Sequence, residues 1–231
     1  MSSASPVILI LGAGPRIGSS VAKAFAAKGY KVALASRKKS EANDTANELH
    51  IQSDFADPNS VINAFSRVTA SLGVPSVVVY NGAASTSNPP NDPFSLQLSD
   101  FSRDLNVNTV SPFVAAQQAA SGFAQLPASS SKTFIYTGNA LNTTIIPPLL
   151  ALGVGKAATA HIIQSAAAAY KDRGYKFYYA DQRKDDGKPV YSAIDGDAHA
   201  ELFLELAEGK LQGPWQQTFV SGVGYKDFGA A

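Results

Sequence analysis

Gly12, Gly14 and Gly18 stand near the start of the chain with the spacing of a loop that can hold a phosphate group. Glycine allows a tight turn and lets the backbone approach a pyrophosphate closely, and the N–H groups that open a helix attract negative charge. The loop follows an apolar run at 7–11 and opens a segment whose apolar residues recur with helical spacing. A strand, this loop and a helix in that order predict a dinucleotide-binding site. The loop residues expected to bind the cofactor are Gly12, Gly14, Arg16, Ile17 and Gly18.

Ser36, Arg37 and Lys38 follow the next predicted strand, at 31–35, and are expected to lie beside the adenosine ribose. A site for NAD typically has a carboxylate here, which binds the 2′-hydroxyl of that ribose, and this position has none. The planar guanidinium of Arg37 can instead bind a 2′-phosphate through two hydrogen bonds. NADP(H) is therefore the predicted cofactor, and a basic turn in solvent is the alternative interpretation.

The composition of the chain excludes several other kinds of function. Its 231 residues include no cysteine, which excludes disulfides, thiol nucleophiles and metal sites built on cysteine. His50, His161 and His199 are too scattered to predict a metal centre. A net charge of +1 without a basic block predicts no nucleic-acid partner. No apolar run approaches the length of about 18 residues that spans a membrane, so we expect a cytoplasmic protein that acts on a small molecule.

Apolar runs and helical segments alternate along the chain, and this alternation predicts the elements that position these residues. The predicted strands are 7–11, 31–35, 50–53, 76–80, 133–136, 176–179 and 217–220. The predicted helices are 17–28, 41–49, 59–71, 96–125, 149–173 and 197–207. Such alternation is typical of an α/β fold with a doubly wound parallel sheet, the three-layer Rossmann fold, and we expect one such domain over 1–231. Ligands of this fold bind beyond the carboxyl ends of the strands, so the loops at 83–93 and 181–197 are expected to contact substrate.

Several stretches of the sequence resemble motifs of the short-chain dehydrogenase/reductase family, and the resemblance extends over almost the whole chain. The glycine loop is similar to the family's Thr-Gly-x-x-x-Gly-Ile-Gly, with Leu11 and Arg16 in place of the threonine and the middle glycine. Asp54 and Phe55 stand where the family has an acid and an apolar residue near the adenine, and the segment 80–83 resembles its Asn-Asn-Ala-Gly. The resemblance implies that Asp54, Phe55, Asn81, Gly82 and Ala83 also bind the cofactor.

The catalytic half of the family pattern is only partly present. The segment 155–158 resembles the end of the family's Tyr-x-x-x-Lys motif, with Lys156 as the lysine that holds the nicotinamide ribose, and Asn108 matches the family's active-site asparagine. Four residues before Lys156 the sequence has Leu152, where the family has its catalytic tyrosine. Leucine can neither donate nor accept a proton. The family's catalytic serine corresponds to Asn139, whose amide can still hydrogen-bond a carbonyl oxygen.

Two further features bear on the chemistry. Tyr136 ends a predicted strand and is a candidate proton donor. After the strand at 176–179 the family has Pro-Gly against the nicotinamide, whereas this chain has Gln182 and Arg183. The charged residues of 181–188 are expected to form a loop in solvent, with a mobile lid as the alternative. The candidate catalytic residues are Asn108, Tyr136, Asn139 and Lys156.

These observations leave two functions open. The first is an atypical NADPH-dependent oxidoreductase that reduces a carbonyl, imine or conjugated alkene of a partly apolar small molecule with hydride from the cofactor. The second is a non-redox protein that binds NADP(H) as a sensor or structural ligand, or uses the pocket for an isomerisation or cyclisation. The resemblance also implies a homodimer or homotetramer that forms through the long helices at 98–125 and 149–170.

Overall fold

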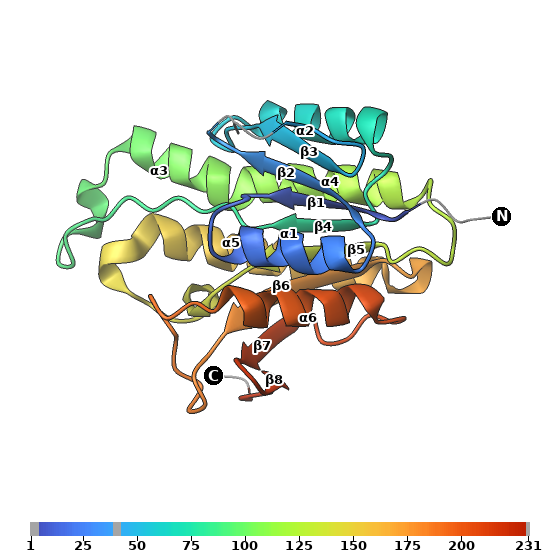
Figure 1. The fold of residues 1–231 in the computed structure, drawn as a ribbon. Coiled ribbons are helices and arrows are strands. Elements are labelled where there is room, and N and C mark those ends of the chain that lie inside the picture. Colours follow the sequence, from blue (N-terminus) through green and yellow to red (C-terminus); the bar gives the residue numbers. More distant parts are fainter. Residues whose placement is uncertain (1–4, 39–42, 230–231) are drawn as a thin grey trace.

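A parallel sheet forms the middle layer of the molecule (Figure 1). The computed structural model describes residues 5–38 and 43–229. The strands are β1 (Val7–Leu11), β2 (Lys31–Ser36), β3 (Glu48–Gln52), β4 (Val77–Tyr80), β5 (Thr133–Thr137), β6 (Lys176–Gln182), β7 (Gln216–Val220) and β8 (Gly224–Tyr225). Their order is β3-β2-β1-β4-β5-β6-β7-β8, and only β8 runs antiparallel to its neighbour. The order changes direction between β1 and β4, so the predicted doubly wound sheet is confirmed.

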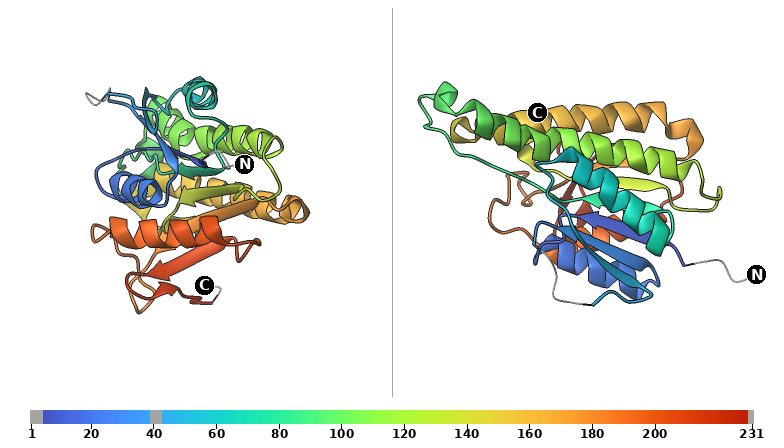
Figure 2. Two further views of the ribbon diagram at one scale, coloured as in Figure 1. Left: turned by 45° about the vertical axis from the view of Figure 1, so that its right-hand side comes forward. Right: turned by 90° about the horizontal axis from the view of Figure 1, so that it is seen from above.

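Helices cover both faces of this sheet, which completes the predicted three-layer Rossmann fold (Figure 2). One face carries α1 (Ile17–Ala27) and α6 (Gly196–Glu208), and the other carries α2 (Pro58–Ser71), α3 (Leu98–Leu105), α4 (Ser111–Phe123) and α5 (Leu150–Ala169). Side chains of one strand alternate between the two cores: Ile8 packs towards α1 and α6, and Leu9 packs towards the opposite helices. The two cores hold the strands in register, so their carboxyl ends meet at one edge of the sheet.

The helix predicted at 41–49 is wrong for the part that the structure describes. Residues 43–47 have no regular structure, and the positions 48 and 49 belong to β3, which begins two residues before the strand predicted at 50–53. Positions 41 and 42 lie outside the described residues. The described part of the connection between β2 and β3 therefore contains no helix.

Side-chain hydrogen bonds explain this difference. The hydroxyl of Thr45 accepts hydrogen bonds from the backbone N–H groups of Asn47 and Glu48. A carboxylate oxygen of Asp44 accepts a hydrogen bond of 2.7 Å from the N–H of His50. Short polar side chains that bind the backbone in this way compete with helical hydrogen bonds. Leu49, at the end of the predicted helix, instead pairs with Ala33 of β2.

The long helix predicted between β4 and β5 is interrupted in its middle. A π-helical turn, η2 (Asn106–Val110), separates α3 from α4, and the N–H of Ser111 donates to the carbonyl of Asn106, five residues earlier. Turns of this kind widen a helix and are frequent at functional sites. Here the carbonyl oxygens of Val107 and Asn108 accept hydrogen bonds from side chains of neighbouring strands.

The other predicted elements differ from the structure mainly at their ends. The helix predicted at 149–173 is α5 followed by a separate 3₁₀ turn at Lys171–Arg173. β6 continues to Gln182, so the loop predicted at 181–197 is shorter and lies between β6 and α6. β8 has no counterpart among the predicted strands. No helix in the described ranges is both long enough and apolar enough to cross a membrane.

Candidate cofactor-binding and active site

A cavity of about 320 Å³ lies at the carboxyl ends of β1, β2 and β4. Its lining consists of Gly12, Ala13, Gly14, Ser36, Arg37, Asp54, Phe55, Ala56, Asn81, Gly82, Ala83, Ala84, Arg103 and Val107. Most residues predicted to bind the cofactor are therefore brought together at one place. The exceptions are Arg16, Ile17, Gly18, Lys38 and Lys156, of which Ile17 and Gly18 are buried in the first turn of α1.

Gly12 makes the close approach between the glycine loop and β4. Its φ angle is +102°, and a Cβ atom there would lie 2.5 Å from the backbone nitrogen of Gly82. The side-chain amide of Asn81 donates a hydrogen bond of 2.8 Å to the Gly12 carbonyl. The N–H groups of Gly12 and Ala13 both donate to the carbonyl of Ala35 on β2. The loop is thus fixed to both neighbours of β1, and no other residue type fits at position 12 without strain.

The first turn of α1 has the properties of an anion site. Arg16 precedes the helix, and among the described residues no side chain caps its N–H groups and none in its first turn is acidic. A Cβ atom at Gly14 would meet no heavy atom within 4 Å, so the backbone borders open space there. Free N–H groups at the positive end of a helix dipole attract a phosphate. The residues present therefore fit the pyrophosphate of a dinucleotide.

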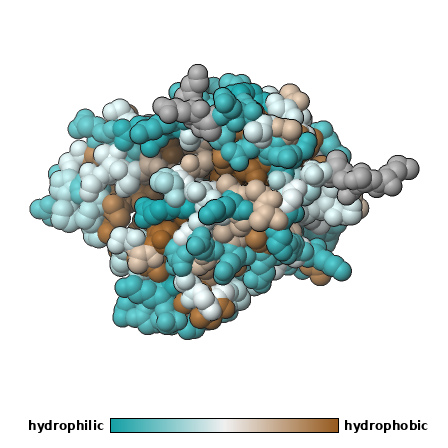
Figure 3. Space-filling model, in the orientation of Figure 1, coloured by the Kyte–Doolittle hydropathy of each residue, from teal (hydrophilic) through white to brown (hydrophobic). Residues whose placement is uncertain are grey.

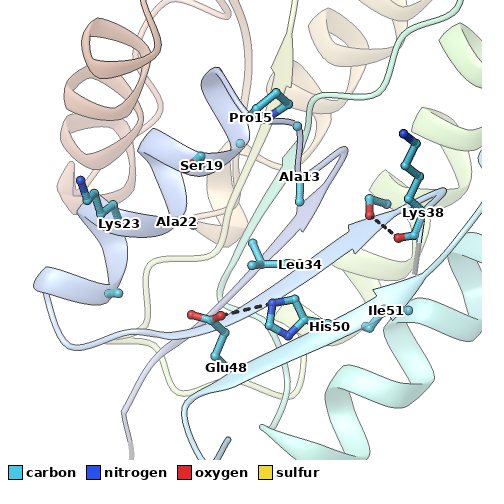
Figure 4. Close-up of a pocket in the computed structure, with 14 residues that line it drawn as sticks. Ala13, Pro15, Ser19, Ala22, Lys23, Leu34, Lys38, Glu48, His50 and Ile51 are labelled. Atoms are coloured by element: carbon cyan, nitrogen blue, oxygen red, sulfur yellow. Dashed lines mark hydrogen bonds and ion pairs between the residues drawn. The ribbon is translucent and has the colours of Figure 1, made fainter. Parts of the chain in front are cut away.

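A second cavity, of about 630 Å³, adjoins the first and shares Ala13, Gly14 and Ser36 with it (Figure 4). It lies between α1 and the strands β2 and β3, and Lys23 and Lys38 stand at opposite sides of it. Across this face of the molecule, apolar residues show in the hollows and hydrophilic residues cover the raised parts (Figure 3). Glu48 also lines this cavity and offsets part of the charge of the two lysines, and Lys38 is the lysine that follows the shared residue Ser36.

Asn108 lies in the π-turn and is fully buried. Its side chain makes two hydrogen bonds with the backbone of Ala84: Oδ1 accepts from the N–H at 3.1 Å, and Nδ2 donates to the carbonyl at 2.7 Å. Its own carbonyl oxygen accepts hydrogen bonds from the hydroxyls of Tyr136 and Thr159. All these contacts are internal, so Asn108 fastens the segment after β4 to the helix layer.

Tyr80, Tyr136 and Tyr179 form a row across β4, β5 and β6, because they pair with one another in the strand register. Neighbouring ring centroids lie 5.8 and 5.6 Å apart, and all three side chains are fully buried. The hydroxyl of Tyr136 donates to the Asn108 carbonyl at 3.2 Å. Burial raises the pKa of Tyr136 above its ordinary value. The phenol of Tyr136 therefore stays protonated and donates its proton to a hydrogen bond with the backbone.

Asn139 follows β5 and is clamped by Tyr179. The hydroxyl of Tyr179 accepts from the N–H of Asn139 at 3.1 Å and donates to its carbonyl at 2.7 Å. The side-chain oxygen of Asn139 accepts a hydrogen bond from the N–H of Leu141. Its Nδ2 has no hydrogen-bond partner within the described part of the chain, so this amide group has donors left for a ligand.

Lys156 enters the site from α5 and is only 3% exposed. Its Nζ donates to the carbonyl of Thr137 at 2.8 Å and lies 4.4 Å from the centroid of the Tyr136 ring. Burial lowers the pKa of Lys156 to about 7, and the carboxylate of Asp181 acts in the opposite direction. Lys156 therefore lies with Tyr136 at the carboxyl end of β5, and one turn before it α5 carries the half-buried Leu152.

Asn88 joins the loop at 83–93 to the segment that leads into α5. Its Nδ2 donates to the carbonyl of Pro147 at 2.9 Å, and its Oδ1 accepts from the N–H of Leu150 at 3.2 Å. The backbone N–H of Asn88 donates to the carbonyl of Pro148 at 3.1 Å. The side chain is buried, so water does not compete for these bonds. Two segments on the same side of the site thus form one connected wall.

Two comparisons with known proteins identify the family. A family model described as enoyl-(acyl carrier protein) reductase matches residues 12–179. The short chain dehydrogenase/reductase dmxR12 of Cryptosporiopsis sp. (strain 8999) is 49% identical over 237 residues, which cover 98% of this chain and 96% of that protein. The chain belongs to the short-chain dehydrogenase/reductase family.

Solved structures of other short-chain dehydrogenases/reductases have the same fold. A short-chain type dehydrogenase/reductase from Mycobacterium marinum superposes with a TM-score of 0.79 at 21% identity, over 95% of each chain. ElxO, whose structure contains bound NADP, superposes with a TM-score of 0.78 at 18% identity, over 94% of this chain and 98% of that one. At this level of identity the likeness concerns the fold alone.

Two charged residues of this short-chain dehydrogenase/reductase that were predicted to belong to a loop in solvent lie in β6 and directly after it. Asp181 is 1% exposed, and Arg183 binds its Oδ2 through Nε and Nη2, both at 2.6 Å. Gln182 is also buried, and its Oε1 accepts from the N–H of Asp195. The expectation of a solvent-exposed loop is thus wrong for Asp181 and Gln182, because the strand extends through them. The unbroken run of residues after Tyr179 without glycine or proline was the signal that could have shown this.

Arg103 is a further residue of the site that the sequence analysis missed. It lines the cofactor cavity, and its guanidinium contacts Asp104 and the hydroxyl of Thr86. Asp104 is fully buried and also accepts a hydrogen bond from the N–H of Thr86. This pair therefore holds the start of the 83–93 loop against α3. The sequence spacing indicates only the ordinary helical ion pair of Arg103 with Asp100, three residues earlier, since adjacent residues such as Arg103 and Asp104 do not face each other on a helix.

Proposed function

We propose that this short-chain dehydrogenase/reductase is an NADP(H)-dependent oxidoreductase that reduces a carbonyl, imine or conjugated alkene of a partly apolar small molecule. The observation that carries the proposal is the cavity at the ends of β1, β2 and β4. It combines an uncapped helix N-terminus, open space beside Gly14, and the cation Arg37 where an NAD site has a carboxylate.

Each part of the dinucleotide has a group of residues that suits its chemistry. The backbone of the glycine loop would hold the pyrophosphate, and Asp54 and Phe55 would border the adenine. The residues proposed to bind the 2′-phosphate are Ser36, Arg37 and Lys38, with Arg16 from the loop. Lys156 would donate to the nicotinamide ribose. When bound, NADPH supplies the hydride, which is the difficult part of the chemistry.

The reacting end of the site differs from the family pattern, and we propose that it works without the family's tyrosine. Leu152 stands at that position, and the hydroxyl of Tyr136, the candidate substitute, is already bound to the backbone of Asn108. The free Nδ2 donors of Asn139 would orient the oxygen or nitrogen of the acceptor. Water would then supply the proton, and an acceptor such as an imine, which is already protonated in water, needs no further acid.

Titration of the protein with NADPH and NADH tests the cofactor. We expect NADPH to bind at least about 10-fold more tightly, because a charge-assisted contact to the 2′-phosphate is worth about 1.5–3 kcal/mol. Arg37→Ala should remove this preference, and Arg67→Ala, which changes an exposed cation on α2, should keep it. The chain has one tryptophan, Trp215, so energy transfer from its fluorescence to NADPH gives a second, independent signal of binding.

Turnover separates the two functions that the sequence leaves open. Loss of NADPH absorbance with an imine or enone substrate would support the oxidoreductase. Tight binding of NADPH without turnover on such a panel would support the non-redox alternative, in which the cofactor is a structural ligand or a signal. Failure of both nucleotides to bind would overturn the proposal for either function.

We also propose that the protein forms a homo-oligomer through α4 and α5. An apolar groove of about 630 Å³ runs between these helices and includes Phe113, Ala116, Ala120, Ile162 and Ala166. Phe113 is half exposed, and small residues on both helices would allow a second copy to approach closely. A dimer through this groove leaves the cofactor cavity, at the ends of β1, β2 and β4, free.

A further inference from the structure

Lys156 and Asp181 lie on the same face of the sheet although they come from different elements. On β6, Tyr179 packs into the core beneath α4 and α5, and Ala180 packs into the opposite core. Side chains alternate along a strand, so Asp181 returns to the α5 side, where Lys156 lies. The two side chains are 1% and 3% exposed. The carbonyl that accepts from Lys156 Nζ belongs to Thr137, which pairs with Ala180, the residue before Asp181. Two buried opposite charges therefore lie at neighbouring positions of β5 and β6 without a direct ion pair.

Arg183 holds the carboxylate of Asp181 in a defined orientation. Both contacts of its guanidinium, from Nε and Nη2, fall on Oδ2 at 2.6 Å, and its Nη1 donates to the carbonyl of Gly187. Oδ1 of Asp181 has no hydrogen-bond partner among the described residues. Arg183 thus fixes the carboxylate through Oδ2, and Oδ1 can still accept a hydrogen bond.

Few other charged or titratable groups surround Lys156. The elements packed on α5 contribute Tyr136 from β5 and Tyr179 from β6, and burial raises the pKa of both phenols, so they stay neutral. The described residues of α4 and the π-turn carry no charged side chain, and the buried carboxylate of α3, Asp104, is already bound by Arg103. Asp181 is the charge that acts on Lys156, and the two groups oppose the effect of burial on each other.

We propose that Asp181 is a positioning residue of this site, which acts through Lys156 by keeping its amine protonated where burial alone favours the neutral form. The inference rests on the proposed function, in which the Lys156 ammonium donates to the cofactor. Only the ammonium has three donors: Thr137 takes one, and the others are available for ribose hydroxyls. Asp181 would thus preserve the ability of the site to hold its cofactor at neutral pH.

The charge of Lys156 can be measured without any cofactor. In protein labelled with ¹³C-lysine, the signal that disappears in Lys156→Met belongs to Lys156, and its pH titration gives the midpoint directly. We expect a midpoint near neutrality in the unmodified protein, and a midpoint lower by about one pH unit or more in Asp181→Asn, because a nearby opposite charge shifts a pKa by about that much. Asp186→Asn removes an exposed carboxylate of the same loop, paired with Lys188, and should leave the midpoint unchanged.

A reciprocal measurement covers the case in which Asp181→Asn does not fold. Coupling between two groups is mutual, so Lys156→Met must raise the midpoint of the Asp181 carboxyl, followed by ¹³C-aspartate labelling. The inference would be overturned if Lys156 has the same midpoint in the unmodified protein and in folded Asp181→Asn. It would also be overturned if the midpoint of Asp181 does not change in Lys156→Met.

The cofactor arm separates this inference from the proposed function. We expect NADPH to bind Asp181→Asn several-fold more weakly than the unmodified protein at pH 7.5, and nearly as well at pH 5.0, where a midpoint lowered by about one unit still leaves Lys156 mostly protonated. Failure of the unmodified protein to bind NADPH would overturn the proposed function and leave the measured coupling intact. Normal NADPH binding together with uncoupled titrations would overturn the inference alone. A loss of affinity that is the same at both pH values would show that Asp181 acts through the shape of the site, which also contradicts it.

Discussion

At the scale of single residues, the site is held by contacts to the backbone. Tyr179 binds both backbone groups of Asn139, Asn108 binds both backbone groups of Ala84, and Lys156 binds the carbonyl of Thr137. Side chains that could do chemistry are therefore largely occupied in fixing the loops around the cavity. The groups that remain available are the N–H groups in the first turn of α1, the Nδ2 of Asn139 and the charged end of Lys156.

Two alanine substitutions in the glycine loop should have different effects. Gly12→Ala forces a Cβ atom against the backbone of Gly82 at a positive φ, so we expect it to lower the free energy of unfolding by at least about 2 kcal/mol. Gly14→Ala meets no neighbouring atom and should leave stability within about 0.5 kcal/mol, yet its methyl group enters the space proposed for the pyrophosphate and should weaken NADPH binding. Urea unfolding and calorimetric titration measure the two quantities. Equal stability losses in both variants would contradict this account of the loop.

At the scale of elements, Lys176 connects the sheet to α6. It is 1% exposed at the start of β6, and its Nζ donates to the carbonyls of Leu206, Ala207 and Gly209 at the end of that helix. These carbonyls have no partner within the helix and carry its negative dipole end. A single buried ammonium thus closes α6 and fixes it beside β6.

Lys176→Met should destabilise the protein by about 2–3 kcal/mol, because methionine fills a similar volume but takes a charged donor away from the carbonyls of Leu206, Ala207 and Gly209, of which Ala207 keeps a second donor in the Ser131 hydroxyl. The loss should be visible as a lower midpoint of urea unfolding with an unchanged slope. Lys171→Met, an exposed lysine of the turn after α5, serves as the control and should change little. A stable Lys176→Met variant would show that water satisfies the end of α6.

The order of the elements could be predicted from the sequence, because buried parallel strands are short apolar runs and helices have their own period. The connection between β2 and β3 could not, since the side chains of Asp44 and Thr45 decide it locally. The glycine loop could be predicted because its backbone conformation and close contacts require glycine, which is visible in the sequence. Asp181 and Arg183 were assigned to a loop in solvent because their ion pair depends on the burial of Asp181 at the end of β6, which charge patterning alone does not indicate.

At the scale of the whole molecule, the helix layers on the two faces of the sheet differ in how closely their helices pack together. The face with α1 and α6 is closed along their mutual contact, whereas the face with α4 and α5 keeps an apolar groove open between these helices. An exposed groove of this kind is a typical interaction surface. At one edge of the sheet, the short strand β8 pairs with β7, so β7 does not offer a free edge to another chain along the paired residues. The groove is therefore the surface we expect to bury in an oligomer.

Phe113→Glu should convert the protein to a monomer, because it introduces a charge into the groove between α4 and α5. Light scattering after size-exclusion chromatography gives the mass directly. Phe94→Glu places the same charge on a phenylalanine that is 90% exposed and outside this groove, and should leave the mass unchanged. An unmodified protein that runs as a monomer at micromolar concentration would contradict the proposed interface.

The buried Asn88 has a consequence for which molecules this site can accept. Because it ties the 83–93 loop to the segment before α5 through several hydrogen bonds, those two segments cannot spread apart without breaking them together. The wall that they form therefore keeps a fixed position. An acceptor would have to fit the space beside this wall as it is, because the wall cannot move to make room for a broader one.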